Sequence, residues 1–188
     1  MIHNPWKYKY EVRVHYTDEN AVETLARYMK EHLKEDMVLI CIGTDRCIGD
    51  ALGPITGTLL EGKDFPYPFY GTVDHPVHAV NLKDMIDIVT TQHPNGFYVA
   101  VDACLGAEDS IGSIHIKKGP IFPGKGVGKK LPSVGNLSIV GIVDKINHDD
   151  CFAIHNIRLS LVMKMAKVIA DALVLATTAA SQSTGSSP

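Results

Sequence analysis

Hydrophobic residues follow two spacings that alternate along the chain, and this alternation predicts the secondary structure. Short apolar runs at 38–42, 97–103 and 138–143 are long enough for buried strands and too short for helices. Between and around them, apolar residues recur every three or four positions. That spacing predicts helices over about 19–33, 49–60 and 81–92, and from Asp149 or Asp150 to about 176.

Weaker patterns predict the remaining elements. Alternating apolar and aromatic positions over 1–16 indicate an extended arm or an edge strand. We expect a short strand at 69–73 and an antiparallel or edge strand at 113–118. The stretch 119–136 is rich in glycine and proline, which excludes regular structure. Helix caps are expected at Thr17 or Asp18, and at Asn81 with Asp84 reaching back three residues later.

This order of strands and helices favours an α/β fold. Strands that alternate with helices pack as a three-layer α/β/α sandwich around a mostly parallel sheet. We expect a single domain over 1–180, with the arm at 1–16 and a disordered tail at 181–188.

Composition and charge indicate which classes of partner and which cellular location to expect. The chain has 188 residues, a net charge of −3, 45% hydrophobic and 21% charged residues, which is typical of a globular domain. This charge gives no reason to expect nucleic acid. No apolar run approaches the roughly 20 residues that span a bilayer, so no membrane partner is expected. The first residues lack an apolar signal-peptide core, which favours a cytoplasmic location.

Cysteine and histidine spacing gives weak signals. The four cysteines form no CxxC pair; Cys41 and Cys104 lie in apolar runs, and Cys47 lies in a polar loop. His75 and His78 have a spacing that two metal ligands can share, but it is common by chance. His115 and His155 stand among apolar residues, as core histidines do. We expect no metal and no cofactor.

The strongest candidate site combines two acidic residues. Strand 38–42 leads into a polar loop with Gly43, Thr44, Asp45, Arg46 and Asp50. Asp102 follows the apolar run 97–101. Because parallel strands end at one edge of a sheet, where ligands collect, the topology makes Asp50 and Asp102 neighbours. Two close carboxyl groups share a proton and can activate water. The alternative is that Asp50 caps the following helix and Asp102 caps a turn.

The loop 117–130 is a second feature. It carries five lysines among glycines and prolines, a composition suited to cradling an anion or covering a peptide cleft. Solvated lysines on a surface loop are the simpler alternative. The Gly43–Gly49 spacing does not fit a phosphate-binding P-loop, so nucleotide binding by that route is not expected.

Three segments resemble a known family. Residues 42–54, 101–103 and 123–128, in this order, are similar to the YyaC family of sporulation proteins. The resemblance covers about residues 35–175. That family is related to the germination protease of spore-forming bacteria and, more distantly, to hydrogenase maturation proteases. It implies a phosphorylase/hydrolase-like (HybD-like) sandwich. The germination protease is regarded as an atypical aspartic peptidase, and its two aspartates match Asp50 and Asp102. It has a His where this chain has Phe122.

The leading hypothesis is therefore a sporulation-associated peptidase-like hydrolase that acts on a protein or peptide, with small acid-soluble spore proteins as the substrates that the resemblance implies. Asp50 and Asp102 are the expected catalytic pair. The expected substrate-binding and orienting residues are Thr44, Asp45, Arg46, Gly124, Lys125, Gly126 and Gly128. The alternative is an inactive peptide- or anion-binding protein of the same fold. A homo-oligomer is compatible with both hypotheses.

Overall fold

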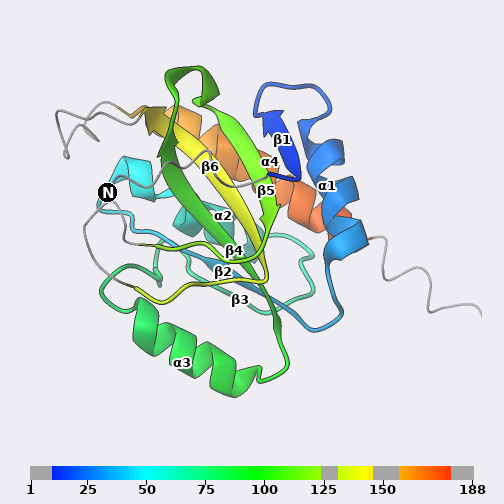
Figure 1. The fold of residues 1–188 in the computed structure, drawn as a ribbon, viewed down its shortest axis with the longest axis vertical. Helices are drawn as coiled ribbons and strands as arrows, with labels where there is room; N and C mark the ends of the chain where they lie inside the picture. Colours follow the sequence, from blue (N-terminus) through cyan, green and yellow to red (C-terminus); the bar gives the residue numbers. More distant parts are fainter. Residues whose placement is uncertain (1–9, 124–130, 146–156, 179–188) are drawn as a thin grey trace, which may run out of the picture.

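A six-stranded sheet forms the centre of the computed structural model, which describes residues 10–123, 131–145 and 157–178 (Figure 1). Its order is β1-β5-β6-β4-β2-β3. The strands are β1 (Val12–His15), β2 (Met37–Cys41), β3 (Phe69–Tyr70), β4 (Phe97–Gly106), β5 (Ser113–Lys118) and β6 (Leu137–Lys145). β3, β2, β4 and β6 pair in parallel, whereas β5 runs antiparallel to β1 and β6. The predicted mostly parallel sheet is confirmed.

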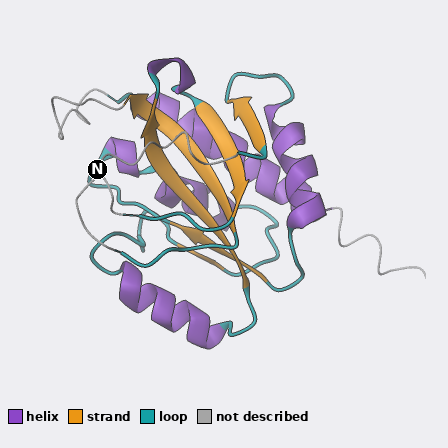
Figure 2. Cartoon of the chain, in the orientation of Figure 1, coloured by secondary structure: helices purple, strands orange, loops and turns teal. Residues whose placement is uncertain are grey.

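Helices cover both faces of this sheet. The helices α1 (Ala21–His32), α2 (Leu52–Glu61) and α4 (Leu159–Thr178) bury their apolar sides in one core cluster with the sheet, and α3 (Leu82–Gln92) buries Leu82 and Val89 in a second. Figure 2 shows α3 apart from the other three helices. Two short 3₁₀ helices, η2 (Ile48–Asp50) and η3 (Glu108–Ser110), complete the elements. The arrangement is the three-layer α/β/α fold predicted from the sequence.

β2 explains why the central strands are apolar without interruption. Met37, Leu39 and Cys41 belong to the cluster beneath α1, α2 and α4. Val38 and Ile40 alternate with them and belong to the cluster beneath α3. Because successive side chains point to opposite faces, a strand covered on both faces needs an apolar residue at every position. Burial of each large side chain contributes about 1.5–3 kcal/mol.

Several element boundaries differ from the predictions. β3 has two residues rather than five, because Gly71 turns the chain with φ 94°. The predicted helix at 49–60 is split into η2 and α2. In the described residues the last helix begins at Leu159, after the non-helical residues 157–158, and the predicted caps at Asp149 and Asp150 lie outside the described residues.

The predicted side-chain caps are also corrected. Asn20, not Thr17 or Asp18, is the N-cap of α1, and the Asp18 carboxylate instead accepts the His15 backbone N–H at 2.7 Å. Asn81 is the N-cap of α3 as predicted, but no side-chain cap hydrogen bond forms there. The Asn81 side chain turns back to the preceding loop, where it accepts the His78 backbone N–H.

Two of the weaker elements, the edge strand of the arm and the strand at 113–118, agree with expectation where they are described. β1 is an edge strand and β5 is antiparallel, although β5 lies inside the sheet. In the described parts of 119–136, one isolated bridge joins Ile121 to Val134. The predicted tail at 181–188 and residues 1–9 of the arm fall outside the described residues. None of the described helices is long and apolar enough to cross a membrane.

α2 packs unusually close to the end of β2. A Cβ at Gly53 would overlap the carbonyl oxygen of Ile42, and a Cβ at Gly57 would overlap that of Gly71. Both glycines therefore let the helix backbone approach neighbouring backbone directly, which no larger residue allows. This close approach fixes where the loop between β2 and α2 lies.

Replacement of Gly53 tests this contact. Alanine normally stabilises a helix by up to about 1 kcal/mol relative to glycine, but at Gly53 it meets the Ile42 backbone. We expect Gly53→Ala to lower the free energy of unfolding by about 2–4 kcal/mol, measured by urea denaturation. Gly62→Ala is the matched control, because nothing lies within 4 Å of a Cβ at Gly62. Equal stability of Gly53→Ala and the parent chain would contradict the close packing.

Candidate functional site

The loop between β2 and α2 is folded tightly at the carboxyl edge of the sheet. Gly43 has φ 140°, and a Cβ there would overlap the Asp50 carbonyl oxygen. The Thr44 backbone N–H donates to that same carbonyl at 3.0 Å. The loop therefore closes on itself and brings Asp50 back beside the end of β2.

Asp50 does not cap α2. The N-cap of that helix is Ala51, and no side chain caps it. The Asp50 residue is half-buried. Burial raises the pKa of its carboxyl group from 3.8 to about 6, opposed by a backbone hydrogen bond from Thr44 and by the charge of His78. The capping alternative for Asp50 is thus wrong, and its carboxyl group is available for other contacts.

Asp102 lies in β4 where β2 has just ended. The last pair between the two strands is Cys41 with Val101, so Asp102 is the next residue along. Contrary to the prediction, β4 does not end at 103 but continues to Gly106 beside β6, with an irregularity after Cys104. The side chain of Asp102 alternates with Val101 and shares the sheet face of Ala100, which is the face covered by α3.

The two carboxyl groups are close enough to interact. Burial and then the charge of Asp50 raise the pKa of Asp102 well above 3.8, opposed by the Ala103 backbone N–H, which donates to Asp102 Oδ1 at 2.9 Å. Asp102 therefore stays neutral over the range in which Asp50 ionises, and a neutral neighbour adds no charge repulsion to Asp50. Asp50 is therefore the group of the pair that ionises first, and Asp102 is the group that holds its proton longer as the pH rises.

The other predicted residues of the first loop surround Asp50 less closely. Asp45 and Arg46 are exposed, and Thr44 is half-buried. The Thr44 hydroxyl donates to Asp45 at 3.4 Å and accepts the Arg46 backbone N–H at 3.3 Å. Among the described side-chain hydrogen bonds, those of Thr44 and Asp45 stay within this turn. Orientation of the pair by Asp45 and Arg46 remains a prediction.

The glycine-lysine loop, which was predicted over 117–130, is described only in its two loop arms, residues 119–123 and 131–136. Gly124, Lys125, Gly126 and Gly128 lie outside the described residues, as do Lys129 and Lys130. Ile121 and Val134, one from each arm, pair with each other and pack in the cluster that includes Ala100 and Val140. Figure 1 shows both arms crossing the sheet toward the side where β2 ends. The arms therefore lie on the same sheet face as Asp102.

Sequence reasoning missed two neighbours of the pair, His78 and Cys104. The charge of His78 acts on Asp50, and the charges of Asp102 and Lys117 act on Cys104. Burial is the main cause that raises the pKa of Cys104 to about 12, so its thiol is protonated. The buried Lys117 donates from Nζ to the Pro120 carbonyl at 2.8 Å. The signal in the sequence that concerns His78 was the His75–His78 spacing, which was considered only as a weak indication of metal ligation.

The structure also locates the other histidines and cysteines singled out in the sequence. Within the described residues, no group of three or more His, Cys, Asp or Glu side chains is arranged to hold a metal ion. His75 is exposed. His115 is a hydrogen-bonded core residue as predicted, because its Nε2 accepts from Arg13 Nε at 2.9 Å. Cys41 is buried and Cys47 half-buried, both as free thiols, while Cys151 and His155 lie outside the described residues.

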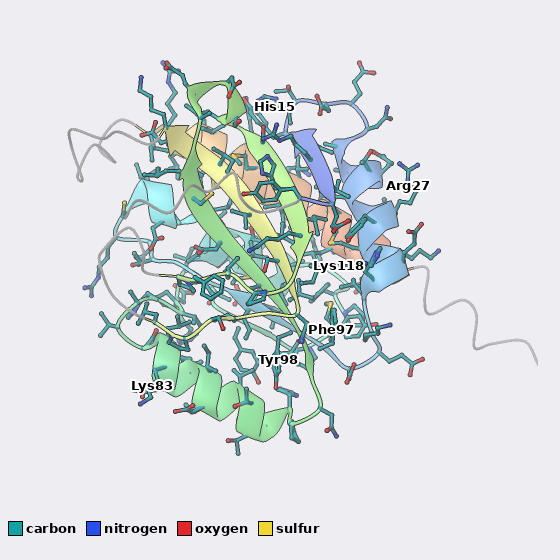
Figure 3. The ribbon with its side chains drawn as sticks, in the orientation of Figure 1. His15, Arg27, Lys83, Phe97, Tyr98 and Lys118 are labelled. Carbon is teal, nitrogen blue, oxygen red and sulfur yellow. The ribbon has the colours of Figure 1, made fainter. Side chains whose placement is uncertain are left out.

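A shallow cavity of about 600 Å³ lies at the opposite edge of the sheet. It is lined by Lys34, Glu35, Asp36, Asn95, Gly96, Phe97 and Asn136. Figure 3 shows Phe97 and Tyr98 at this end of β4, away from the loop that carries Asp50. Tyr98 is anchored there, since its hydroxyl donates to the His93 carbonyl at 2.5 Å. The cavity contains no member of the aspartate pair.

Replacement of Asp50 tests the protonation of the pair. The folded-state pKa of Asp50, about 6, exceeds 3.8, so the native protein loses stability as the pH rises through this interval. Asparagine does not ionise and escapes this loss. We expect Asp50→Asn to raise the free energy of unfolding at pH 8 by on the order of 2 kcal/mol, with a smaller gain at pH 4, measured by urea denaturation. The exposed Asp87→Asn serves as control; no difference between the two pH values in Asp50→Asn would contradict the assignment.

Comparison with known proteins places the chain in a family. Residues 13–172 match a family model described as "Protein of unknown function (DUF1256)". The chain is also 44% identical over 167 residues to "Uncharacterized protein YyaC" of Bacillus subtilis (strain 168), a match that covers 86% of this chain and 82% of that protein. Both matches span β2, β4, Asp50 and Asp102. With a family model that covers most of its length and a relative this similar, the chain belongs to the DUF1256 family.

Proposed function

We propose that this protein is a peptidase-like hydrolase that uses Asp50 and Asp102 as its catalytic pair. The observation that carries the proposal is that two interacting carboxyl groups at the carboxyl edge of the sheet both have raised pKa values, with Asp50 the first to ionise. Perturbed neighbouring carboxyl groups are typical of acid–base sites. The resemblance of both segments to the germination protease supports peptide hydrolysis in particular.

The chemistry follows from the two protonation states. The Asp50 carboxylate accepts a proton from water, whose oxygen attacks the peptide carbonyl carbon, while neutral Asp102 donates its proton to the carbonyl oxygen. The resulting diol collapses as the carbon–nitrogen bond breaks. Asp50 gives its proton to the leaving nitrogen, and Asp102 regains one from the hydroxyl of the diol. The products are a carboxylic acid and an amine, and both aspartates return to their starting states.

The position of the two loop arms supports the proposal of a protein or peptide substrate. They cross the same sheet face as Asp102, and their apolar residues Ile121 and Val134 are held by the core. Exposed Phe122 follows Ile121 on one arm. We propose that the glycine-lysine segment between the arms, with Thr44, Asp45 and Arg46, binds the backbone of the substrate. By the resemblance, the substrates are small acid-soluble spore proteins in the cytoplasm of the sporulating cell or the spore.

Charge-neutral variants test the catalytic pair. Asp50→Asn removes the base and Asp102→Asn removes the transferable proton, so each is expected to lower the rate of cleavage of a small acid-soluble spore protein by at least about 100-fold. Asp87→Asn, on the exposed side of α3, is expected to keep full activity. Cleavage is followed by gel electrophoresis and mass spectrometry of the products.

Two results would decide against this function. Full activity in either site variant would exclude the aspartate mechanism. If the parent chain cleaves no spore protein but binds a peptide or an anion saturably, and this binding weakens in Lys125→Ala, Lys129→Ala and Lys130→Ala, then the non-catalytic alternative is correct. Circular dichroism of each variant confirms that the fold is retained.

A further inference from the structure

We propose that His78 is a positioning residue of this site, which places the negative charge of the aspartate pair on Asp50 and leaves the proton on Asp102. The proposal rests on the proposed function for its catalytic meaning, but the placement of charge can be measured without a substrate. Three features of the structure support it: the attachment of the His78 loop to β2, the locking of that loop by Asn81, and the hydrogen bonding of the imidazole.

The segment before α3 is attached to the end of β2. Val77 forms a parallel bridge with Ile42, and its carbonyl accepts the Gly43 backbone N–H at 2.8 Å. Gly43 is in turn packed against the Asp50 carbonyl. The chain therefore passes from Val77 to His78 directly beside the loop that carries Asp50. This contact joins two segments that are more than 25 residues apart in sequence.

Asn81 locks the backbone at His78. The Asn81 side-chain oxygen accepts the His78 backbone N–H at 2.8 Å, and its amide nitrogen donates to the Pro76 carbonyl at 2.9 Å. The His78 carbonyl accepts the backbone N–H groups of Asn81 and Leu82, at 3.1 and 2.8 Å. Both backbone polar groups of His78 are thus engaged, which explains why Asn81 turns away from α3 instead of capping it. A catalytic group benefits from a support of this rigidity.

The imidazole is oriented as well. Its Nδ1 accepts the Val80 backbone N–H at 3.2 Å, so in the neutral ring the hydrogen is on Nε2. His78 is half-buried, and its charge lowers the pKa of Asp50. Among the described residues, the other titratable groups on these segments are Asp102 in β4, the exposed Asp45 and Arg46 in the loop of Asp50, and the exposed Asp74 and His75 in the loop of His78.

The charges in the site affect the two aspartates differently. Among the described groups, the histidine acts on Asp50, while the charge that acts on Asp102 is the negative charge of Asp50. A cationic or hydrogen-donating imidazole favours the ionised form of the carboxyl group nearest to it. His78 and the Thr44 backbone hydrogen bond both favour Asp50 as the base, while burial and the charge of Asp50 keep Asp102 the acid. His78 therefore strengthens the order of roles in the proposed reaction.

Variants at His78 test the placement of charge. Carboxyl ¹³C NMR of the parent chain and of His78→Asn follows the Asp50 titration, which is assigned by its loss in Asp50→Asn. We expect His78→Asn to raise the pKa of Asp50 by about half a pH unit or more, and His78→Lys, which places a positive charge at this position, to prevent that rise. His75→Asn is the matched control, because His75 belongs to the same loop but is exposed. His78→Gln replaces the asparagine variant if that one does not fold.

Activity provides the second readout. With a cleaved spore protein as substrate, the acid limb of the kcat/KM profile, which reports the free enzyme, is expected to move upward in His78→Asn by the shift that NMR measures. A merely structural histidine would lower activity at every pH without moving the limb. An unchanged Asp50 titration in His78→Asn, or the same change in His75→Asn, would overturn the proposal. If Asp50→Asn and Asp102→Asn both retain cleavage, the proposed function fails while the NMR result still decides the role of His78.

Discussion

The end of β2 is the point on which the rest of the structure depends, because three backbone segments approach it with no side chain between them. Gly53 brings α2 against the Ile42 carbonyl, Gly71 brings the chain after β3 against the Cys41 carbonyl, and Gly43 brings the loop back against Asp50. Any larger residue would separate these segments. Asp50 takes part in one of these contacts, and His78 follows Val77, whose carbonyl accepts the Gly43 backbone N–H.

Burial of the two neighbouring aspartates determines the order in which they ionise. The loops at the carboxyl edge of the sheet partly bury both aspartates. There the cost of a second negative charge is high, so Asp102 holds its proton while Asp50 releases one. A surface pair of aspartates would both ionise and would offer no acid. The fold therefore supplies the asymmetry that an acid–base pair requires, and the loop arms on the same face provide a place for a substrate backbone.

The sequence predicted the fold well, because its signals are local. The apolar runs of β2, β4 and β6 and the helical spacing of α1 to α4 identify strands and helices without reference to the rest of the chain. The candidate pair followed from topology, since strand ends of a parallel sheet share an edge. Boundaries were less accurate: β4 runs past Asp102 because β6 offers it a partner, and β3 stops early at Gly71. The local hydrophobic pattern of a strand does not show which other strand it will pair with.

The part of the site that the sequence did not predict also depends on contacts between segments that are far apart in the chain. Nothing in the spacing of His75 and His78 shows that Val77 pairs with Ile42, or that Asn81 turns back to hold His78. The most direct test of the account is the carboxyl ¹³C shift of Asp102 across the pH range of the folded protein. The account predicts a protonated Asp102 at pH 7, with Asp50 ionising near pH 6. Two ionised aspartates at pH 7, each with an ordinary pKa near 4, would contradict it.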